Sequence, residues 1–148
     1  RQRQMCIRDS FKKVWEMAAF AGFLTGREAA KYMTARNEGS IFFTGATASM
    51  RGGSGFSAFA SAKFALRAVS QSMARELGPQ GIHVAHFIID GAIDTAFIKE
   101  NFPDRYALKE KDGILQPDAI ADAYWFVHMQ HRSAWTHELD LRPYMEKF

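Results

Sequence analysis

The chain has 148 residues, of which 47% are hydrophobic and 24% are charged, a balance that excludes a disordered chain. The sequence has no run of about 18 apolar residues and only one cysteine, so neither a membrane span nor a disulfide framework is expected. The net charge of +3 comes from scattered lysines and arginines, a pattern that does not indicate a nucleic-acid-binding surface.

The first ten residues, Arg1–Ser10 (RQRQMCIRDS), have neither an amphipathic period nor the apolar region of a signal peptide. The codons ATG TGT ATA AGA GAC AGN, with a pyrimidine last, translate to the second part of this decamer and resemble a transposon-end sequencing adapter. We therefore interpret residues 1–10 as an adapter scar and exclude them from the fold prediction. The only cysteine, Cys6, lies in this segment, so residues 11–148 offer no thiol chemistry.

The first half of the remaining chain predicts a helix, a strand and a second helix. Apolar residues at helical spacing favour a helix over Phe11–Met33, and the short apolar run Ser40–Thr44 (SIFFT) favours a strand buried on both faces. A loop rich in Gly, Ser, Ala and Thr follows over Gly45–Gly55. A long helix is then expected over Gly55–Leu77, ended by the Gly78-Pro79 pair.

The second half repeats the alternation. The apolar run Ile82–Ile89 predicts a strand, and the charged segment Ala96–Leu115 predicts irregular structure. Pro117 suits the first position of a helix that runs to about Gln130, and the alternating stretch Ala134–Leu141 predicts a last strand. Helices alternating with strands indicate an α/β fold with a parallel sheet and right-handed crossovers.

The block Gly39–Thr95 resembles the short-chain dehydrogenase/reductase family. Its linked features are a strand leading into a Ser/Gly loop, an aromatic residue four positions before a lysine, the sequence Arg-Glu-Leu-Gly-Pro, a further strand, and Gly-x-Ile-x-Thr. The resemblance implies a Rossmann-like, doubly wound parallel sheet, of which this chain is the C-terminal portion with about three strands and three helices. Residues 11–148 are thus expected to be the C-terminal part of a single dehydrogenase domain, because no Gly-rich dinucleotide fingerprint is present.

The family's catalytic positions are mostly replaced in this chain. The resemblance implies a tyrosine acid/base, a lysine four residues later that lowers its pKa, a serine, and often an asparagine. Phe59 stands at the tyrosine position, Ala46 at the serine position and Ala18 at the asparagine position, while Lys63 is retained. Because phenylalanine has no proton to transfer, the usual mechanism cannot run through Phe59.

Two hydroxyl groups of the same loop are candidates for the missing catalytic hydroxyl. Ser49 lies ten residues before Phe59, and Thr47 lies next to the serine position. Our predicted catalytic residues are Lys63 and Ser49, with Thr47 as an alternative to Ser49. Ordinary loop polarity is the competing interpretation of both hydroxyl groups, as a solvated helix position is for Lys63.

The resemblance also implies a set of cofactor contacts. Gly91, Ile93 and Thr95 match the family's Pro-Gly-x-x-x-Thr segment, which meets the nicotinamide end of the cofactor, although Asp90 replaces the proline. We predict that these three residues, together with Phe59 and Lys63, contact the cofactor. The choice between NAD and NADP is not readable from these residues. The segment Ala96–Leu115 stands where the family places its mobile substrate lid.

The five histidines do not predict a metal site. His128 and His131 lie at a helix end near His137, whereas His83 and His86 lie on opposite faces of a strand and cannot easily share a ligand. No residue pattern resembles a complete ligand set, and no sequence feature selects one histidine as a general acid.

Two functional hypotheses follow from the sequence. The first is an oxidoreductase that uses NAD or NADP on a small carbonyl or alcohol substrate with an altered proton donor. The second is a non-catalytic relative that keeps the fold and the cofactor as a binding or partner subunit. The expected setting is the cytoplasm, without nucleic-acid or membrane partners. The full-length protein is expected to be a homo-oligomer that pairs its two long helices.

Overall fold

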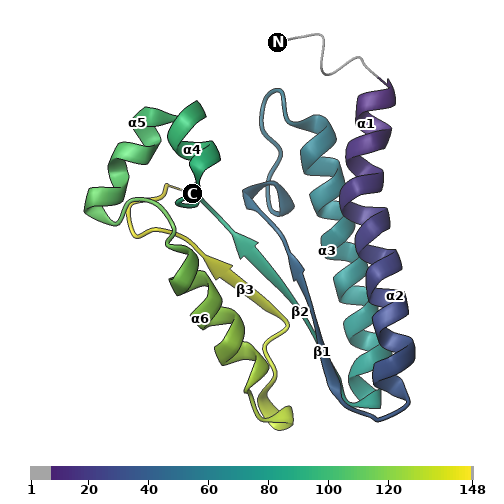
Figure 1. Ribbon diagram of the computed structural model, residues 1–148. Helices are drawn as coiled ribbons and strands as arrows, with labels where there is room; N and C mark the ends of the chain where they lie inside the picture. The colour runs from purple at the N-terminus through teal and green to yellow at the C-terminus, as the bar shows by residue number, and fades with distance from the viewer. Residues whose placement is uncertain (1–7, 148) are drawn as a thin grey trace.

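The computed structural model describes residues 8–147, and a three-stranded parallel sheet lies at its centre (Figure 1). The strands are β1 (Gly39–Thr44), β2 (Ile82–Ile89) and β3 (Glu138–Leu141), in the order β1-β2-β3. The register pairs Phe43 with His86, and His86 with Glu138. These findings confirm the predicted α/β class and parallel sheet. Most of the decamer interpreted as an adapter scar lies outside the described residues.

Strand β2 is buried along its whole length because helices cover both of its faces. Side chains alternate along a strand, so its even-numbered residues share one face and its odd-numbered residues share the other. Val84 packs in a core formed with Ile41, Phe43 and Leu66, whereas Phe87 packs in a separate core with Leu115 and Val127. The two cores lie on opposite faces of the sheet.

One face of the sheet carries the helices α1 (Arg8–Trp15), α2 (Ala21–Thr34) and α3 (Ser57–Leu77) (Figure 1). A π-helical turn over Glu16–Phe20 joins α1 to α2, so the predicted helix Phe11–Met33 is confirmed with a local irregularity. Ala18, at the family's asparagine position, lies in this turn. The outward side leaves several apolar side chains exposed, namely Trp15, Met17, Phe20 and Phe23. The predicted pairing of the long helices in an oligomer remains a prediction.

The other face carries helix α6 (Pro117–His128), which begins at the predicted proline. The segment Ala96–Leu115 is more regular than we expected, because it contains α4 (Ala96–Asn101), α5 (Pro103–Tyr106) and a 3₁₀ turn over Ala107–Lys111. The Thr95 hydroxyl accepts a hydrogen bond from Ile98 N at 3.3 Å and caps α4. Pro103 starts α5, where its missing N–H costs nothing.

The predicted strand Ala134–Leu141 is wrong over its first four residues. Strand β3 begins only at Glu138, and Arg132–Ala134 form a 3₁₀ turn. Thr136 N donates to the side chain of Gln130 at 2.8 Å, so this backbone group bonds outside the sheet ladder. Alternation alone therefore overestimated the length of the strand.

Candidate functional site

The retained lysine lies at the carboxyl end of β1. Lys63 is on α3, and its Nζ donates a hydrogen bond to the carbonyl oxygen of Thr44, the last residue of β1, at 2.8 Å. Burial lowers the pKa of Lys63, because the ammonium loses hydration there. Phe59 lies one helical turn earlier, with Lys63 Nζ 5.8 Å from its ring centroid. The Phe59 ring is 39% exposed and offers an apolar surface without a proton donor.

The chain turns tightly immediately after β1. Gly45 N donates to the carbonyl oxygen of Phe87 at 2.6 Å, which extends the contact between β1 and β2 by one residue. A 3₁₀ turn over Thr47–Ser49 follows, and Ser49 Oγ accepts a hydrogen bond from Ala46 N at 3.1 Å. Ser49 is fully buried, whereas Thr47 is half-buried. The catalytic role that the sequence predicts for Ser49 remains a prediction.

The segment after β2 lies at the same edge of the sheet, because neighbouring parallel strands end on the same side. Gly91 has a φ of 150°, and an added Cβ would lie 2.9 Å from the ring of Pro143, so both conformation and space require glycine. Ile93 forms an isolated parallel bridge with Leu115. Thr95 caps α4. The three predicted cofactor contacts Gly91, Ile93 and Thr95 thus form one ordered connection at the edge where Lys63 lies.

A buried carboxylate joins the two strand ends. Asp90 is 2% exposed and accepts a hydrogen bond from the Thr47 hydroxyl, with 2.5 Å between Oγ1 and Oδ1. The guanidinium of Arg51 lies 3.3 Å from Oδ1 and 3.4 Å from Oδ2. Sequence reasoning identified Thr47 and Asp90 separately but not their contact. The available signal was two polar residues, each within three positions of the end of one of two adjacent parallel strands.

A second polar network crosses the middle of the sheet on the α3 face. Arg67 donates two hydrogen bonds of 2.7 Å to the carboxylate of Glu138, and His86 Nδ1 lies 3.0 Å from the same carboxylate. Because this carboxylate accepts, Nδ1 carries the proton, and His86 Nε2 has no hydrogen-bond partner within residues 8–147.

Burial sets the charge states in this network. Burial lowers the pKa of His86, and the hydrogen bond to Glu138 offsets this only in part. Burial acts to raise the pKa of Glu138, but the hydrogen bonds from Arg67 and His86 outweigh burial and keep it below its ordinary value. The network therefore consists of a carboxylate, a guanidinium and a neutral imidazole.

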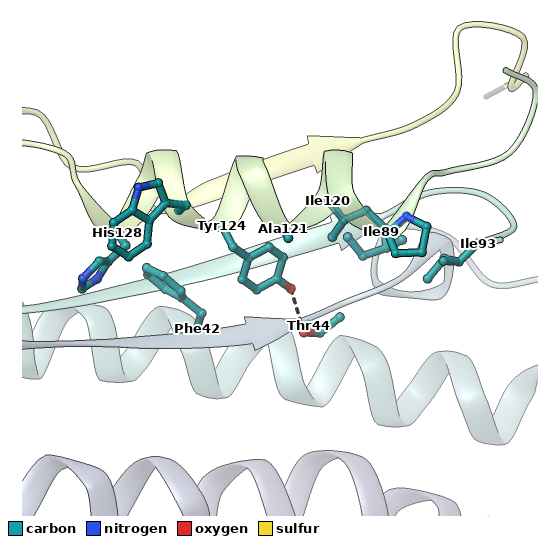
Figure 2. Close-up of a pocket in the computed structure, with 10 residues that line it drawn as sticks. Phe42, Thr44, Ile89, Ile93, Ile120, Ala121, Tyr124 and His128 are labelled. Atoms are coloured by element: carbon teal, nitrogen blue, oxygen red, sulfur yellow. Dashed lines mark hydrogen bonds between the residues drawn. The ribbon is translucent and has the colours of Figure 1, made fainter. Parts of the chain in front are cut away.

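An apolar pocket of about 620 Å³ lies on the opposite face, between β1 and α6 (Figure 2). Its walls include Phe42, Ile89 and Ile120, and Ile93 borders it. The Tyr124 hydroxyl lies 2.7 Å from Thr44 Oγ1, as the dashed line in Figure 2 shows. Burial raises the pKa of Tyr124, so this hydroxyl stays protonated.

Within residues 8–147, no three His, Cys, Asp or Glu side chains come together as a metal-ligand group. In the same part of the chain, none of the helices has the length and apolar character needed to cross a membrane.

Comparisons with known proteins give a consistent result. The model of the short chain dehydrogenase family matches residues 2–106. A crystal structure of a short-chain dehydrogenase from Rhodopseudomonas palustris is 55% identical, with a TM-score of 0.71, over 90% of this chain and 52% of that chain. Short chain aldehyde dehydrogenase 1 of Euphorbia lathyris is 36% identical over 76 residues, which are 51% of this chain and 26% of the relative.

A more distant structure agrees in fold. 4-hydroxyisoleucine dehydrogenase complexed with NADH is 22% identical and has a TM-score of 0.75 over 92% of this chain and 59% of that chain. This chain thus spans about half the length of the solved structures that it matches, and less of the curated relative. The family model covers more than half of the sequence, and the sheet has the expected parallel topology. The chain belongs to the short chain dehydrogenase family.

Proposed function

We propose that the protein is an oxidoreductase that uses NAD or NADP on a carbonyl or alcohol substrate, with an altered proton donor. The observation that supports this most directly is Lys63, whose half-buried ammonium is held at the carboxyl end of β1 by the Thr44 carbonyl. The nicotinamide group, when bound, would supply the hydride chemistry, which is the cofactor's own.

The residues at this edge suit the nicotinamide end of such a cofactor. A lysine ammonium has three N–H donors, and one of them reaches Thr44, so two remain for the ribose hydroxyl groups. Gly91 lets the connection after β2 pack against the ring of Pro143, which fixes the course of the backbone towards Ile93 and Thr95. Ile93 and the ring of Phe59 offer apolar surface. The proposed contacts concern the nicotinamide end of the cofactor, and the choice between NAD and NADP stays open.

A second reading is a non-catalytic cofactor-binding or partner subunit. Three side chains at the family's catalytic positions are apolar, namely Ala18, Ala46 and Phe59. In that case the same edge would bind cofactor without turnover. Substrate specificity does not follow from either reading.

The test combines cofactor binding with turnover. NADH and NADPH binding is measured by fluorescence, and their oxidation is assayed over a panel of aldehydes and ketones. We expect Lys63→Ala to weaken binding or turnover by at least about tenfold, the effect of losing one charged hydrogen bond. Lys13→Ala, an exposed lysine on α1, serves as the matched control and should leave both unchanged.

The outcomes separate the two readings. Turnover in the parent that Lys63→Ala abolishes would exclude the non-catalytic reading. Binding without turnover in the parent, with activity gained by the double variant Ala46→Ser/Phe59→Tyr, would exclude the altered-donor reading. Absence of both binding and turnover would exclude both.

A further inference from the structure

The proton-handling group of an active site without the family tyrosine has to be sought among the polar side chains at the carboxyl edge of the sheet. Four hydroxyl groups lie near the end of β1: those of Thr44, Thr47, Ser49 and Tyr124, of which Thr44 and Tyr124 bond to each other. Ser49 is fully buried and already accepts a bond from Ala46 N. Tyr124 comes from α6, on the face of the sheet away from Lys63, and bonds to the Thr44 side chain. Thr47 remains, with a half-buried side chain whose hydroxyl bonds Asp90.

The hydrogen bond of Thr47 determines what its hydroxyl can do. A carboxylate accepts and does not donate, so Thr47 donates its proton to Asp90 Oδ1 across 2.5 Å. The lone pairs of Thr47 Oγ1 are then left to accept a proton from another group. A short O–H···O⁻ contact of this kind is a charge-assisted hydrogen bond and allows proton transfer along it.

Asp90 is placed to act as the end of such a relay. It is 2% exposed, and it lies directly before Gly91, one of the predicted cofactor contacts. The contacts from Arg51 are long, at 3.3 and 3.4 Å, and the Arg51 side chain is 43% exposed. The guanidinium therefore stabilises the carboxylate without occupying it as tightly as a short bidentate pair would.

We propose that Thr47 and Asp90 form the proton-transfer pair of this protein, in the place that Phe59 and Ala46 leave vacant. The proposal rests on the proposed nicotinamide-dependent function. In the oxidative direction, the substrate O–H bond breaks and its proton passes to Thr47 Oγ1, while the Thr47 proton passes to Asp90 Oδ1. The carbinol C–H bond breaks at the same time, and its two electrons leave as hydride to the oxidised nicotinamide. The products are the carbonyl compound, the reduced nicotinamide and a protonated Asp90.

A first experiment needs neither cofactor nor substrate. Isotope-edited infrared spectroscopy of protein labelled with ¹³C-aspartate reports the carboxylate stretch of Asp90, identified by its loss in Asp90→Asn. We expect this band to shift in Thr47→Val, which removes the hydroxyl donor, and to stay in place in Thr47→Ser. The control is Thr25→Val, since the Thr25 hydroxyl bonds only its own helix. An unchanged band in Thr47→Val would overturn the pair.

A second experiment measures turnover and cofactor binding in the same variants. We expect Thr47→Val and Asp90→Asn to lower kcat by about 10²- to 10⁴-fold, the usual range for a positioned acid or base. Thr47→Ser should retain most of the activity, and the affinity for NADH or NADPH should be the same in all variants. Asp118→Asn, an exposed carboxylate on α6, is the control for loss of a negative charge.

Different results would contradict the proton-transfer pair and the proposed function. A parent protein that turns over, with kcat unchanged in Thr47→Val, would overturn the proton-transfer pair and leave the proposed function intact. A parent protein that neither binds the cofactor nor turns over would overturn the proposed function and the pair together.

Discussion

The α3 face of the sheet contains two arginine–carboxylate pairs that differ in geometry. Arg67 meets Glu138 through two bonds of 2.7 Å in mid-sheet, and His86 completes this network. Arg51 meets Asp90 at 3.3 and 3.4 Å at the strand ends, and there Thr47 makes the short contact. The carboxylate of Glu138 makes short hydrogen bonds with its arginine, whereas the carboxylate of Asp90 makes its shortest hydrogen bond with a hydroxyl group. The first pair joins helix α3 to strand β3, and the second is the one that we propose takes part in proton transfer.

The largest expected effect is the loss of stability when the mid-sheet pair is broken. Arg67→Ala should lower the free energy of unfolding by about 3 kcal/mol, because Glu138 loses its cationic partner. Arg51→Ala should cost about 1 kcal/mol, since its contacts are longer, its side chain is 43% exposed, and the buried Asp90 keeps its hydrogen bond from Thr47. Chemical denaturation of both variants compares the two pairs directly, and equal losses would contradict the distinction.

A smaller effect is expected at Gly45, in the turn after β1. An added Cβ on Gly45 would lie within 3 Å of both His86 Nε2 and Ser49 Oγ. Gly45→Ala should therefore destabilise the protein by about 2 kcal/mol through overpacking. Gly52→Ala is the matched control, because no heavy atom lies within 4 Å of its added Cβ. An unchanged free energy of unfolding in Gly45→Ala would show that the loop after β1 is less tightly packed than described.

Acidification should weaken the mid-sheet network. Burial lowers the pKa of His86 and of His83, so the unfolded chain binds more protons than the folded protein as the pH falls below about 6.5. The free energy of unfolding should thus decrease by on the order of 1 kcal/mol between pH 7 and pH 5. Thermal melts across this range measure the trend, and His86→Asn should flatten it. A midpoint that rises on acidification would contradict the neutral state of these histidines.

The smallest effect is expected at the surface. Glu28 bonds both Arg27 and Lys31 on the exposed side of α2, and these bonds lower the pKa of Glu28. Such pairs are screened by solvent, so Glu28→Ala should leave the thermal midpoint unchanged within error. A marked shift of the thermal midpoint in Glu28→Ala would mean that the geometry of an ion pair does not predict its contribution to stability in this protein.

Much of the fold was predictable because its signals are local. Strand β2 has the predicted bounds, since its largely apolar run of eight residues is flanked by Gly81 and Asp90, which cannot extend it. Helix α6 starts at Pro117 for an equally local reason. The helices α4 and α5 were missed in a charged segment, although the cap at Thr95 and the proline at 103 were signals for them.

The site was predictable only in part, since its residues are linked through contacts that spacing does not reveal. The family motif placed Lys63 at the edge of the sheet, and β1 supplied the carbonyl that holds it. The partnership of Thr47 with Asp90 spans 43 residues and depends on how the turn after β1 aims its side chains. The pairing of Arg67 with Glu138 spans 71 residues and depends on the register of β2 and β3.

The most direct test of the central claim is whether the carboxyl edge of the sheet binds a nicotinamide nucleotide. Reduced nicotinamide mononucleotide lacks adenosine and therefore probes the proposed nicotinamide contacts alone. In a two-dimensional NMR titration of the protein, we predict shift changes centred on Gly91, Ile93 and Thr95 that are lost in Lys63→Ala. Changes centred elsewhere in the protein, or changes that persist unaltered in Lys63→Ala, would contradict the account.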